Sequence, residues 1–222
     1  LKFTIMKRTL FFAASLFMLF AFKPNVQAQE FSTGVDLYSS YVWRGTNFSG
    51  PSLQPYVDFT AGGFSVGAWG SQGYDGFQEM DLYLSYGFDF GLSLGLTDYY
   101  YPGTEFFDYS TETGAHAFEI NAGFEAGALS LSANYILNEA GGAASAGGDM
   151  YYEVGVAAGS VDLFVGAGDG WHTPDGEFGV CNVGLGTSKE VQMTESFSLP
   201  VSGSVILNPT TEQFFIVVGI SL

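Results

Sequence analysis

The pattern that most limits the fold of this chain is an alternation of apolar and polar side chains with a period of two. Leu129, Leu131 and Ala133, for example, alternate with Ser130 and Ser132. Successive side chains of a β-strand point to opposite faces, so such runs predict strands with one apolar and one polar face. After residue 28 we find no helical period and no apolar run near 18 residues in length. The pattern predicts an all-β fold without a transmembrane helix.

Similar runs recur to the end of the sequence and predict about twelve strands. Their expected ranges are 31–44, 52–60, 64–71, 79–88, 92–101, 115–125, 129–138, 149–157, 161–169, 178–187, 195–206 and 212–222. The alternation is least regular at 64–71 and 178–187. Pro55 and Pro200 fall inside strands, where each removes a donor from the hydrogen-bond ladder, so we expect bulges there.

The connections between these strands alternate between short and long. Residues 61–63, 89–91, 126–128 and 158–160 form short turns, whereas 73–76, 102–114, 139–148 and 170–176 form longer polar loops. The segment 188–194 breaks the rule, because it is long on the side of the short turns. Tight turns at one end and long loops at the other are typical of antiparallel up-and-down barrels of the bacterial outer membrane.

The first 28 residues have the organisation of a secretory signal peptide. Lys7 and Arg8 precede the apolar run Leu10–Phe22, which is too short to span a bilayer, and a small-residue site ends at Ala28. We expect cleavage after Ala28, leaving a single barrel domain over residues 29–222. Such a chain belongs in the outer membrane of a Gram-negative bacterium.

Charge excludes several classes of function. Without residues 1–28 the chain keeps two basic residues, Arg44 and Lys189, against 23 acidic ones, a net charge of −21. A nucleic-acid partner is excluded, because phosphate recognition needs Lys and Arg. The single cysteine, Cys181, permits no internal disulfide and no Cys-rich metal site. We expect no cofactor.

The two faces of the predicted strands differ in kind. One face is apolar with hardly any charge, as a lipid-facing surface must be. Aromatic residues near strand ends are expected to form interface girdles: Trp43, Phe64, Trp69, Phe88, Tyr99, Tyr100, Phe118, Phe124 and Trp171. A soluble periplasmic binding barrel with the faces reversed is the alternative. The scarcity of Lys and Arg favours a membrane barrel, with outer-membrane lipids and the barrel-assembly machinery as partners.

Residues 38–55 read Tyr-Ser-Ser-Tyr-Val-Trp-Arg-Gly-Thr-Asn-Phe-Ser-Gly-Pro-Ser-Leu-Gln-Pro. This block resembles the opening of the TorF-type porin family, in which Tyr-x-Phe/Trp-Arg-Gly precedes a Ser/Thr-rich loop and Pro-x-aliphatic-Gln. Gly67–Ser71, Glu79–Tyr83 and Tyr99–Gly103 agree with the later pattern, and the match covers about residues 34–125. The resemblance implies an exported barrel with a pore and no known substrate. Leu222 departs from the terminal aromatic residue common in barrel-assembly signals.

The polar face predicts the lining of a pore. Its charged candidates are Asp36, Arg44, Asp58, Asp81, Glu119, Glu153 and Asp162. Rings of carboxylates select cations, so we expect a narrow, cation-preferring diffusion channel for small ions or solutes. The inward tyrosines Tyr38, Tyr56, Tyr83 and Tyr151 are candidates for blocking it. A non-conducting barrel used for structure or surface interaction remains the alternative.

Arg44 falls on the inward phase near the external end of the first strand. It is expected either to shape selectivity at a constriction or to form a structural ion pair with a carboxylate such as Asp58, Glu79 or Asp81. His116 and His172 have no hydroxyl at a spacing typical of barrel hydrolases, so no catalytic residue and no enzyme activity is predicted. The loop acids lack the spacing of a calcium-binding loop, so no metal site is predicted.

Overall fold

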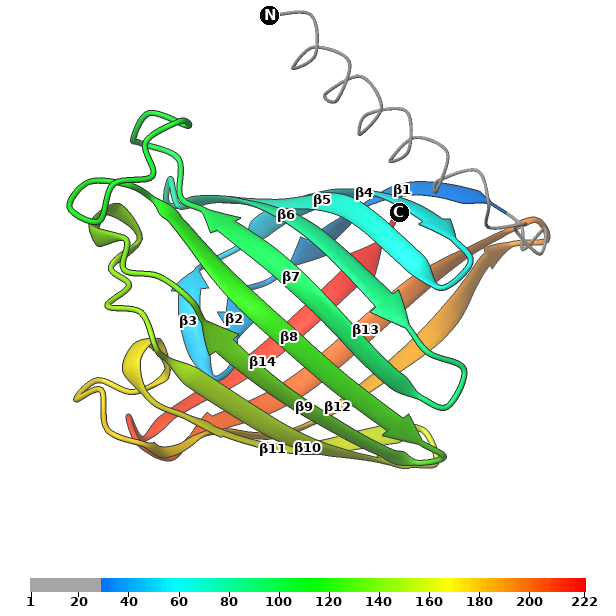
Figure 1. Ribbon diagram of the computed structural model, residues 1–222. Helices are drawn as coiled ribbons and strands as arrows, with labels where there is room; N and C mark the ends of the chain where they lie inside the picture. Colours follow the sequence, from blue (N-terminus) through cyan, green and yellow to red (C-terminus); the bar gives the residue numbers. More distant parts are fainter. Residues whose placement is uncertain (1–28) are drawn as a thin grey trace, which may run out of the picture.

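The computed structural model describes residues 29–222, which form a closed antiparallel barrel of twelve strands (Figure 1). This architecture confirms the predicted all-β, up-and-down barrel. The expected signal peptide, residues 1–28, lies outside the described residues. Within residues 29–222, no helix has the length and apolar character needed to cross a membrane.

The wall strands pair in chain order, and β1 closes the ring against both β4 and β14. They are β1 Glu30–Tyr38, β4 Ser52–Ala61, β5 Phe64–Gly73, β6 Gln78–Gly87, β7 Leu92–Tyr100, β8 His116–Ala126, β9 Leu129–Ile136, β10 Met150–Ala158, β11 Val161–Gly168, β12 Gly179–Thr194, β13 Phe197–Asn208 and β14 Gln213–Ser221. The remaining elements are β2 Tyr41–Trp43, β3 Thr46–Ser49 and two 3-10 turns, η1 Gly141–Ala143 and η2 Gly170–His172.

The period-two alternation sets which face of each strand turns outward. Leu84 and Leu131 are 46% and 39% exposed, whereas Asp81 and Glu119, on inward positions of β6 and β8, are 7% and 1% exposed. Exposed apolar side chains continue around the barrel on the same outward phase: Leu53, Val66, Leu82, Leu94, Ile120, Val154, Leu163, Val165, Leu185, Leu207, Phe214, Ile216 and Val218. The outer surface is therefore apolar and the lumen polar.

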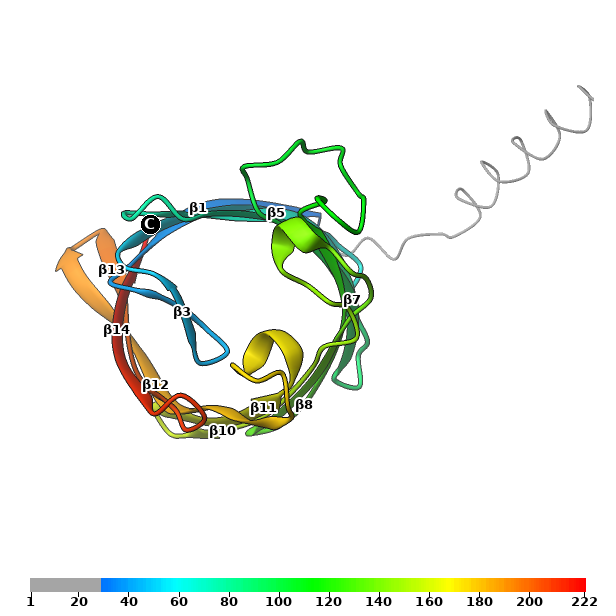
Figure 2. The same ribbon diagram turned by 90° about the vertical axis from the view of Figure 1, so that its left-hand side faces the viewer.

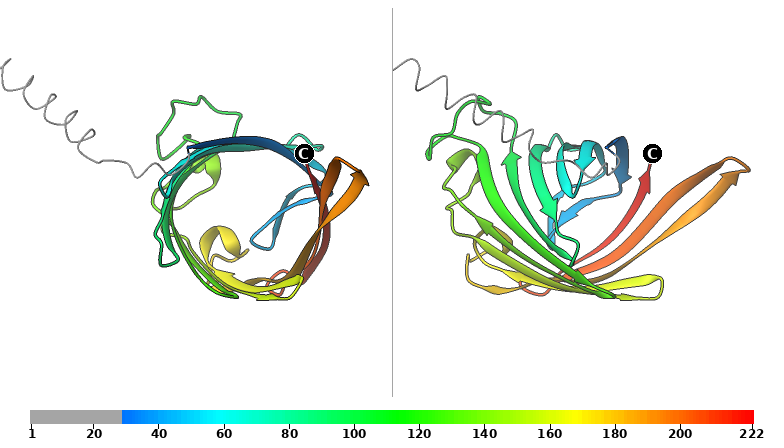
Figure 3. Two further views of the ribbon diagram at one scale, coloured as in Figure 1. Left: turned by 90° about the vertical axis from the view of Figure 1, so that its right-hand side faces the viewer. Right: turned by 45° about the vertical axis from the view of Figure 1, so that its right-hand side comes forward.

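The tight turns lie at one end of the barrel and the long loops at the other (Figure 1). The expected long connection 188–194 is wrong, because these residues continue β12. Ser188 pairs with Ser202 and Gln192 with Ser198, so backbone pairing orders a polar stretch that has the composition of a loop. The resulting β12–β13 hairpin projects past the turn end of the barrel (Figure 3).

The first predicted strand, 31–44, is also wrong at its end. β1 stops at Tyr38, and residues 41–49 fold back as the β2–β3 hairpin inside the barrel (Figure 2). Arg44 and Gly45 at its tip have φ of 49° and 80°. Positive φ at both central residues is the signature of a type I′ hairpin turn. The alternation runs unbroken through the bend at residues 39–40, so it could not reveal that the chain leaves the wall.

The expected bulges at the two prolines are absent from the described strands. Pro55 stays in register opposite Val35, and Pro200 opposite Glu190. On its other side Pro55 has no paired residue in β5, which accommodates the missing donor without a shift in register. The register shifts instead near Ala167 in β11 and between Gln192 and Thr194 in β12.

Candidate functional site

The β2–β3 hairpin crosses the loop-end half of the lumen (Figure 2). Its tip reaches β12, where a Cβ on Gly45 would overlap the carbonyl oxygen of Cys181. Asn208 of β13 holds the same tip, because its Nδ2 donates to the carbonyl oxygen of Gly45 over 3.1 Å. Only glycine combines the positive φ with this close approach to the wall.

Aromatic contacts hold the sides of the hairpin. Tyr41 packs on Trp69 of β5, with ring centroids 5.5 Å apart, and Trp43 packs on Tyr99 of β7 at 5.6 Å. Trp171 of η2 lies near both Trp43 and Tyr99, with ring centroids 6.5 Å and 6.1 Å away. The hairpin is therefore seated against strands from several parts of the wall.

These contacts correct part of the predicted girdle. Trp43, Trp69, Tyr99 and Trp171 lie in the lumen around the hairpin and do not face outward. Trp69 pairs with Asp81 on the inward face, and Trp43 and Trp171 are carried by segments that leave the wall. Large aromatic residues occupy the interior here, because the interior of a twelve-stranded barrel is too wide to be filled by small side chains.

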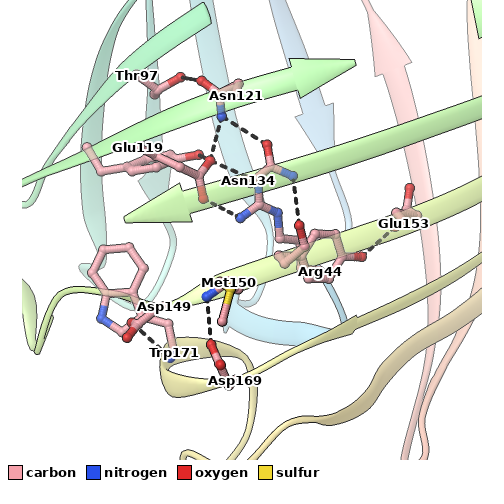
Figure 4. Close-up of polar contacts among 12 residues, drawn as sticks. Arg44, Thr97, Glu119, Asn121, Asn134, Asp149, Met150, Glu153, Asp169 and Trp171 are labelled. Carbon is pink, nitrogen blue, oxygen red and sulfur yellow. Dashed lines mark hydrogen bonds and ion pairs between the residues drawn. The ribbon is translucent and has the colours of Figure 1, made fainter. Parts of the chain in front are cut away.

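At the centre of the site Arg44 forms a two-pronged ion pair with Glu119 of β8 (Figure 4). Its Nη1 and Nη2 donate to Oε1 and Oε2 over 2.6 Å and 2.9 Å. The guanidinium carbon also lies 4.3 Å from the Trp43 ring centroid and 4.5 Å from that of Tyr151. Planar pairing and stacking of this kind suit arginine and cannot be reproduced by lysine.

Hydrogen bonds extend the ion pair along the inner wall. The Tyr99 hydroxyl donates to Glu119 over 2.9 Å, and Asn121 Nδ2 donates to the same carboxylate over 2.6 Å (Figure 4). Asn121 also bonds to Thr97 and Asn134, at 2.8 Å and 3.0 Å. Glu119 is thus fully partnered, which explains how it is buried to 1% exposure.

Six of the seven predicted lining residues lie on inward strand positions, whereas Arg44 lies at the tip of the β2–β3 hairpin, and the seven do not form one ring. Asp36, Asp58, Asp81, Glu119, Glu153 and Asp162 are spread over different strands and heights of the barrel. Arg44 does pair with a carboxylate, but its partner is Glu119 and not one of the acids named as examples, Asp58, Glu79 and Asp81. The hairpin carries Arg44 across the lumen to Glu119. The two residues are 75 positions apart in the sequence, and no sequence pattern predicts this contact.

Other carboxylates of the predicted set have their own partners. The Tyr83 hydroxyl donates to Asp58. Asn182 Nδ2 donates over 2.9 Å to Glu153, which also accepts from the Tyr151 hydroxyl. Two further inward acids, Glu79 and Glu125, were not predicted as lining residues. Each lies an even number of positions from a predicted lining residue of its own strand, Asp81 for Glu79 and Glu119 for Glu125. The alternation itself could therefore have identified them.

The turn-end half of the lumen is hollow. Cavities of about 510 Å³ and 340 Å³ open there, and both are lined by Glu125, Ser130 and Glu153. Asp162 lines the second cavity. Within residues 29–222 no group of three or more His, Cys, Asp or Glu side chains could hold a metal ion. The lumen therefore combines an open acidic vestibule with a filled constriction at the hairpin.

The other histidine candidate lies outside the lumen. The loop formed by residues 101–115 lies outside the barrel (Figure 2). His116, on the outward phase of β8, contacts Phe106 and Tyr109 of this loop. Its Nδ1 lies 2.9 Å from Asp98, and its Nε2 lies 2.6 Å from the carbonyl oxygen of Phe106. Tyr100 stacks on the imidazole, and the Tyr109 ring lies beside it at a tilt. The residue fastens this loop to the outer wall.

Removing the guanidinium should loosen the hairpin. We expect Arg44→Ala to lower the free energy of unfolding by about 3–5 kcal/mol, because it leaves the Glu119 carboxylate buried without its cation. Urea titration of the folded protein in detergent, followed by tryptophan fluorescence, measures this. The double variant Arg44→Met with Glu119→Gln should recover most of the loss. Equal destabilisation in both variants would contradict a role for the charge pair.

Docking of η2 should depend on pH. Burial, followed by repulsion from Arg44, lowers the pKa of His172 to about 3. A histidine in water has a pKa of about 6.5, so the released segment binds a proton that the docked one excludes. Docking should therefore weaken about tenfold per pH unit below about 6.5, measured as protease cleavage within residues 169–178. His172→Phe, which keeps a ring beside Trp43 and Tyr151, should abolish this dependence; an unchanged pH profile would refute the assignment.

Comparisons with known proteins give one family and a set of partial structural likenesses. A mutant of the porin of Rhodopseudomonas blastica is 15% identical, with a TM-score of 0.41, over 77% of this chain and 55% of that chain. A second mutant is 13% identical, with a TM-score of 0.44, over 88% and 73% of the two chains. The chain thus spans about half the length of the first of these porins. No curated protein matches it.

The family comparison covers most of the sequence. The profile that matches describes a bacterial protein of unknown function, Gcw_chp, and it aligns with residues 24–194. This range contains the whole β2–β3 hairpin, Glu119 and the acidic vestibule. The chain belongs to the Gcw_chp family.

Proposed function

We propose that this protein is an outer-membrane, TorF-type porin: a narrow, cation-preferring channel for small solutes, constricted by the β2–β3 hairpin. The observation that carries the proposal is the combination of an apolar outer wall with a lumen rich in carboxylates. The one guanidinium in this lumen, that of Arg44, is already paired with Glu119. The hollow vestibule at the turn end supplies room for hydrated ions.

The apolar outer surface supports the membrane location. Leu84, Leu131 and Val165, on three separate strands, are each more than a third exposed and point away from the lumen. Such a surface is costly in water but suits the hydrocarbon core of a bilayer, where a closed barrel also leaves no unpaired strand edge. The expected signal peptide supplies the route of export.

The charge of the lumen supports cation preference. Inward carboxylates outnumber the basic groups of the lumen, where Arg44 is the one guanidinium among the described residues and is held by Glu119. Low-dielectric walls focus such a negative potential, concentrate cations and expel anions. The acids concerned are Asp36, Asp58, Glu79, Asp81, Glu119, Glu125, Glu153 and Asp162.

The seated hairpin favours a second candidate function. Because Tyr41, Trp43 and η2 occupy the loop-end half of the lumen, a permanently closed barrel used for structure or surface interaction is the alternative. A closed barrel would bind no transported solute. We propose neither an enzymatic activity nor a cofactor for either candidate.

Planar-bilayer recording of the purified protein across a KCl gradient distinguishes the two candidates. We expect single-channel steps and a reversal potential that favours K⁺ over Cl⁻. Replacing residues 41–49 by a short Gly/Ser linker should increase the conductance, because it removes the constriction. Steps that appear only after this replacement would favour the closed barrel.

Selectivity should depend on the acids of the vestibule. Glu125→Gln with Asp162→Asn should reduce the preference for K⁺, most clearly below about 0.1 M salt, where screening is weak. The matched control is Glu105→Gln with Glu112→Gln, which removes the same charge from the loop outside the barrel and should change selectivity less. Anion preference, or equal effects of the two pairs, would defeat this account of the lumen.

Arginine scanning tests the membrane location. Leu84→Arg should cost about 2–4 kcal/mol, because the charge would enter the lipid, whereas Ser85→Arg on the inward face should be milder. Leu131 and Ser132 provide a second pair with the same geometry. The fraction of protein that folds into vesicles, read from the mobility of unheated samples in gels, measures the difference. Equal damage at adjacent positions would contradict a lipid-facing band.

A further inference from the structure

We propose that Ser71, Glu79 and Asp81 form a binding site for a hard divalent cation, at the place where the β2–β3 hairpin meets the barrel wall. The site is separate from the Arg44–Glu119 pair. It does not depend on the proposed channel function, because it would hold in an open or a closed barrel.

The strand register brings the three side chains together. Ser71 of β5 lies directly opposite Glu79 of β6, and Asp81 follows Glu79 by two residues on the same face. All three face the lumen, where their exposed fractions are 5%, 5% and 7%. Side chains paired across antiparallel strands, or two apart along one strand, are near neighbours.

Each of these side chains carries a buried oxygen without a hydrogen-bond partner: Ser71 Oγ, Glu79 Oε2 and Asp81 Oδ1. Buried polar atoms are rarely left unpaired, and buried carboxylates require a cation or a proton. Among the described residues, no basic side chain neutralises these two carboxylates. Arg44 is committed to Glu119, and Lys189 lies at the turn end of β12, whereas Glu79 lies at the loop end of β6.

The donor set identifies the class of ligand. Carboxylate and hydroxyl oxygens prefer hard ions such as Ca²⁺, and the two carboxylates match a divalent charge. Two acid ligands are few for calcium, so water must complete the coordination and the affinity should be modest, with a Kd of about 10⁻⁴–10⁻³ M.

The site also reaches the hairpin. The hydroxyls of Tyr41, from β2, and Tyr101, which follows β7, lie beside the Glu79 carboxylate. Tyr41 in turn packs on Trp69, the neighbour of Asp81 across the ladder. Cation binding should therefore strengthen the seating of the hairpin against β5 and β6.

Titration of the folded, metal-free protein in detergent at neutral pH tests the proposal. Terbium, a luminescent substitute for Ca²⁺, should be sensitised by Trp69 and the adjacent tyrosines, and added Ca²⁺ should displace it. Ca²⁺ should also slow protease cleavage of the hairpin. Saturable binding that is lost at least tenfold in Glu79→Gln with Asp81→Asn supports the site.

A matched control separates this site from general attraction to an acidic protein. Glu105→Gln with Glu112→Gln removes the same charge from an exposed loop and should leave terbium binding unchanged. Because Gln and Asn keep the shape of the buried acids, the site variant should still fold, which the mobility of unheated gel samples verifies. Absence of saturable binding in the native protein would mean that protons neutralise the two acids. That result, or equal binding by both double variants, would overturn the proposal.

Discussion

Closure of the β-ladder is the constraint on which the rest of this structure depends. Every wall strand pairs on both sides, and β1 meets both β4 and β14, so the ring leaves no continuous open edge. Closure lets the outer surface be apolar throughout, because no backbone group has to be solvated from that side. It also forces polar and acidic side chains into a shared lumen, where their charges must be paired, hydrated or neutralised.

The β2–β3 hairpin supplies the main partner for the charges of the lumen. It brings the one available guanidinium to Glu119, and its aromatic side chains occupy space that inward glycines and serines leave open. Arg44 adopts a left-handed backbone conformation, which costs a non-glycine residue about 1–2 kcal/mol. Its ion pair, stacking and hydrogen-bonded neighbours offset that cost. The segment Tyr41–Gly45 is thus the part of the chain that shapes the lumen.

The two ends of the lumen consequently differ in character. At the loop end, the rings of Trp43 and Tyr151 pack against Arg44, and its partner Glu119 accepts further hydrogen bonds from Tyr99 and Asn121. At the turn end, Glu125 and Asp162 line open cavities and have no comparable partners. A solute entering from the turn end would therefore meet a hydrated acidic vestibule first and the seated hairpin afterwards.

The sequence by itself determined the all-β class, the strand count and the face that each side chain occupies, because period-two alternation is a local consequence of strand geometry. The same alternation puts Asp36, Asp58 and Asp81 on the inward phase of their strands. Only the tertiary structure decided that residues 41–49 leave the wall, that Arg44 pairs with Glu119, and that residues 188–194 extend a strand. The bend at residues 39–40 reverses the path of the chain without interrupting the alternation, so the alternation cannot reveal it. Contacts across the lumen join residues that are far apart in the sequence, and no local pattern predicts which residues will meet.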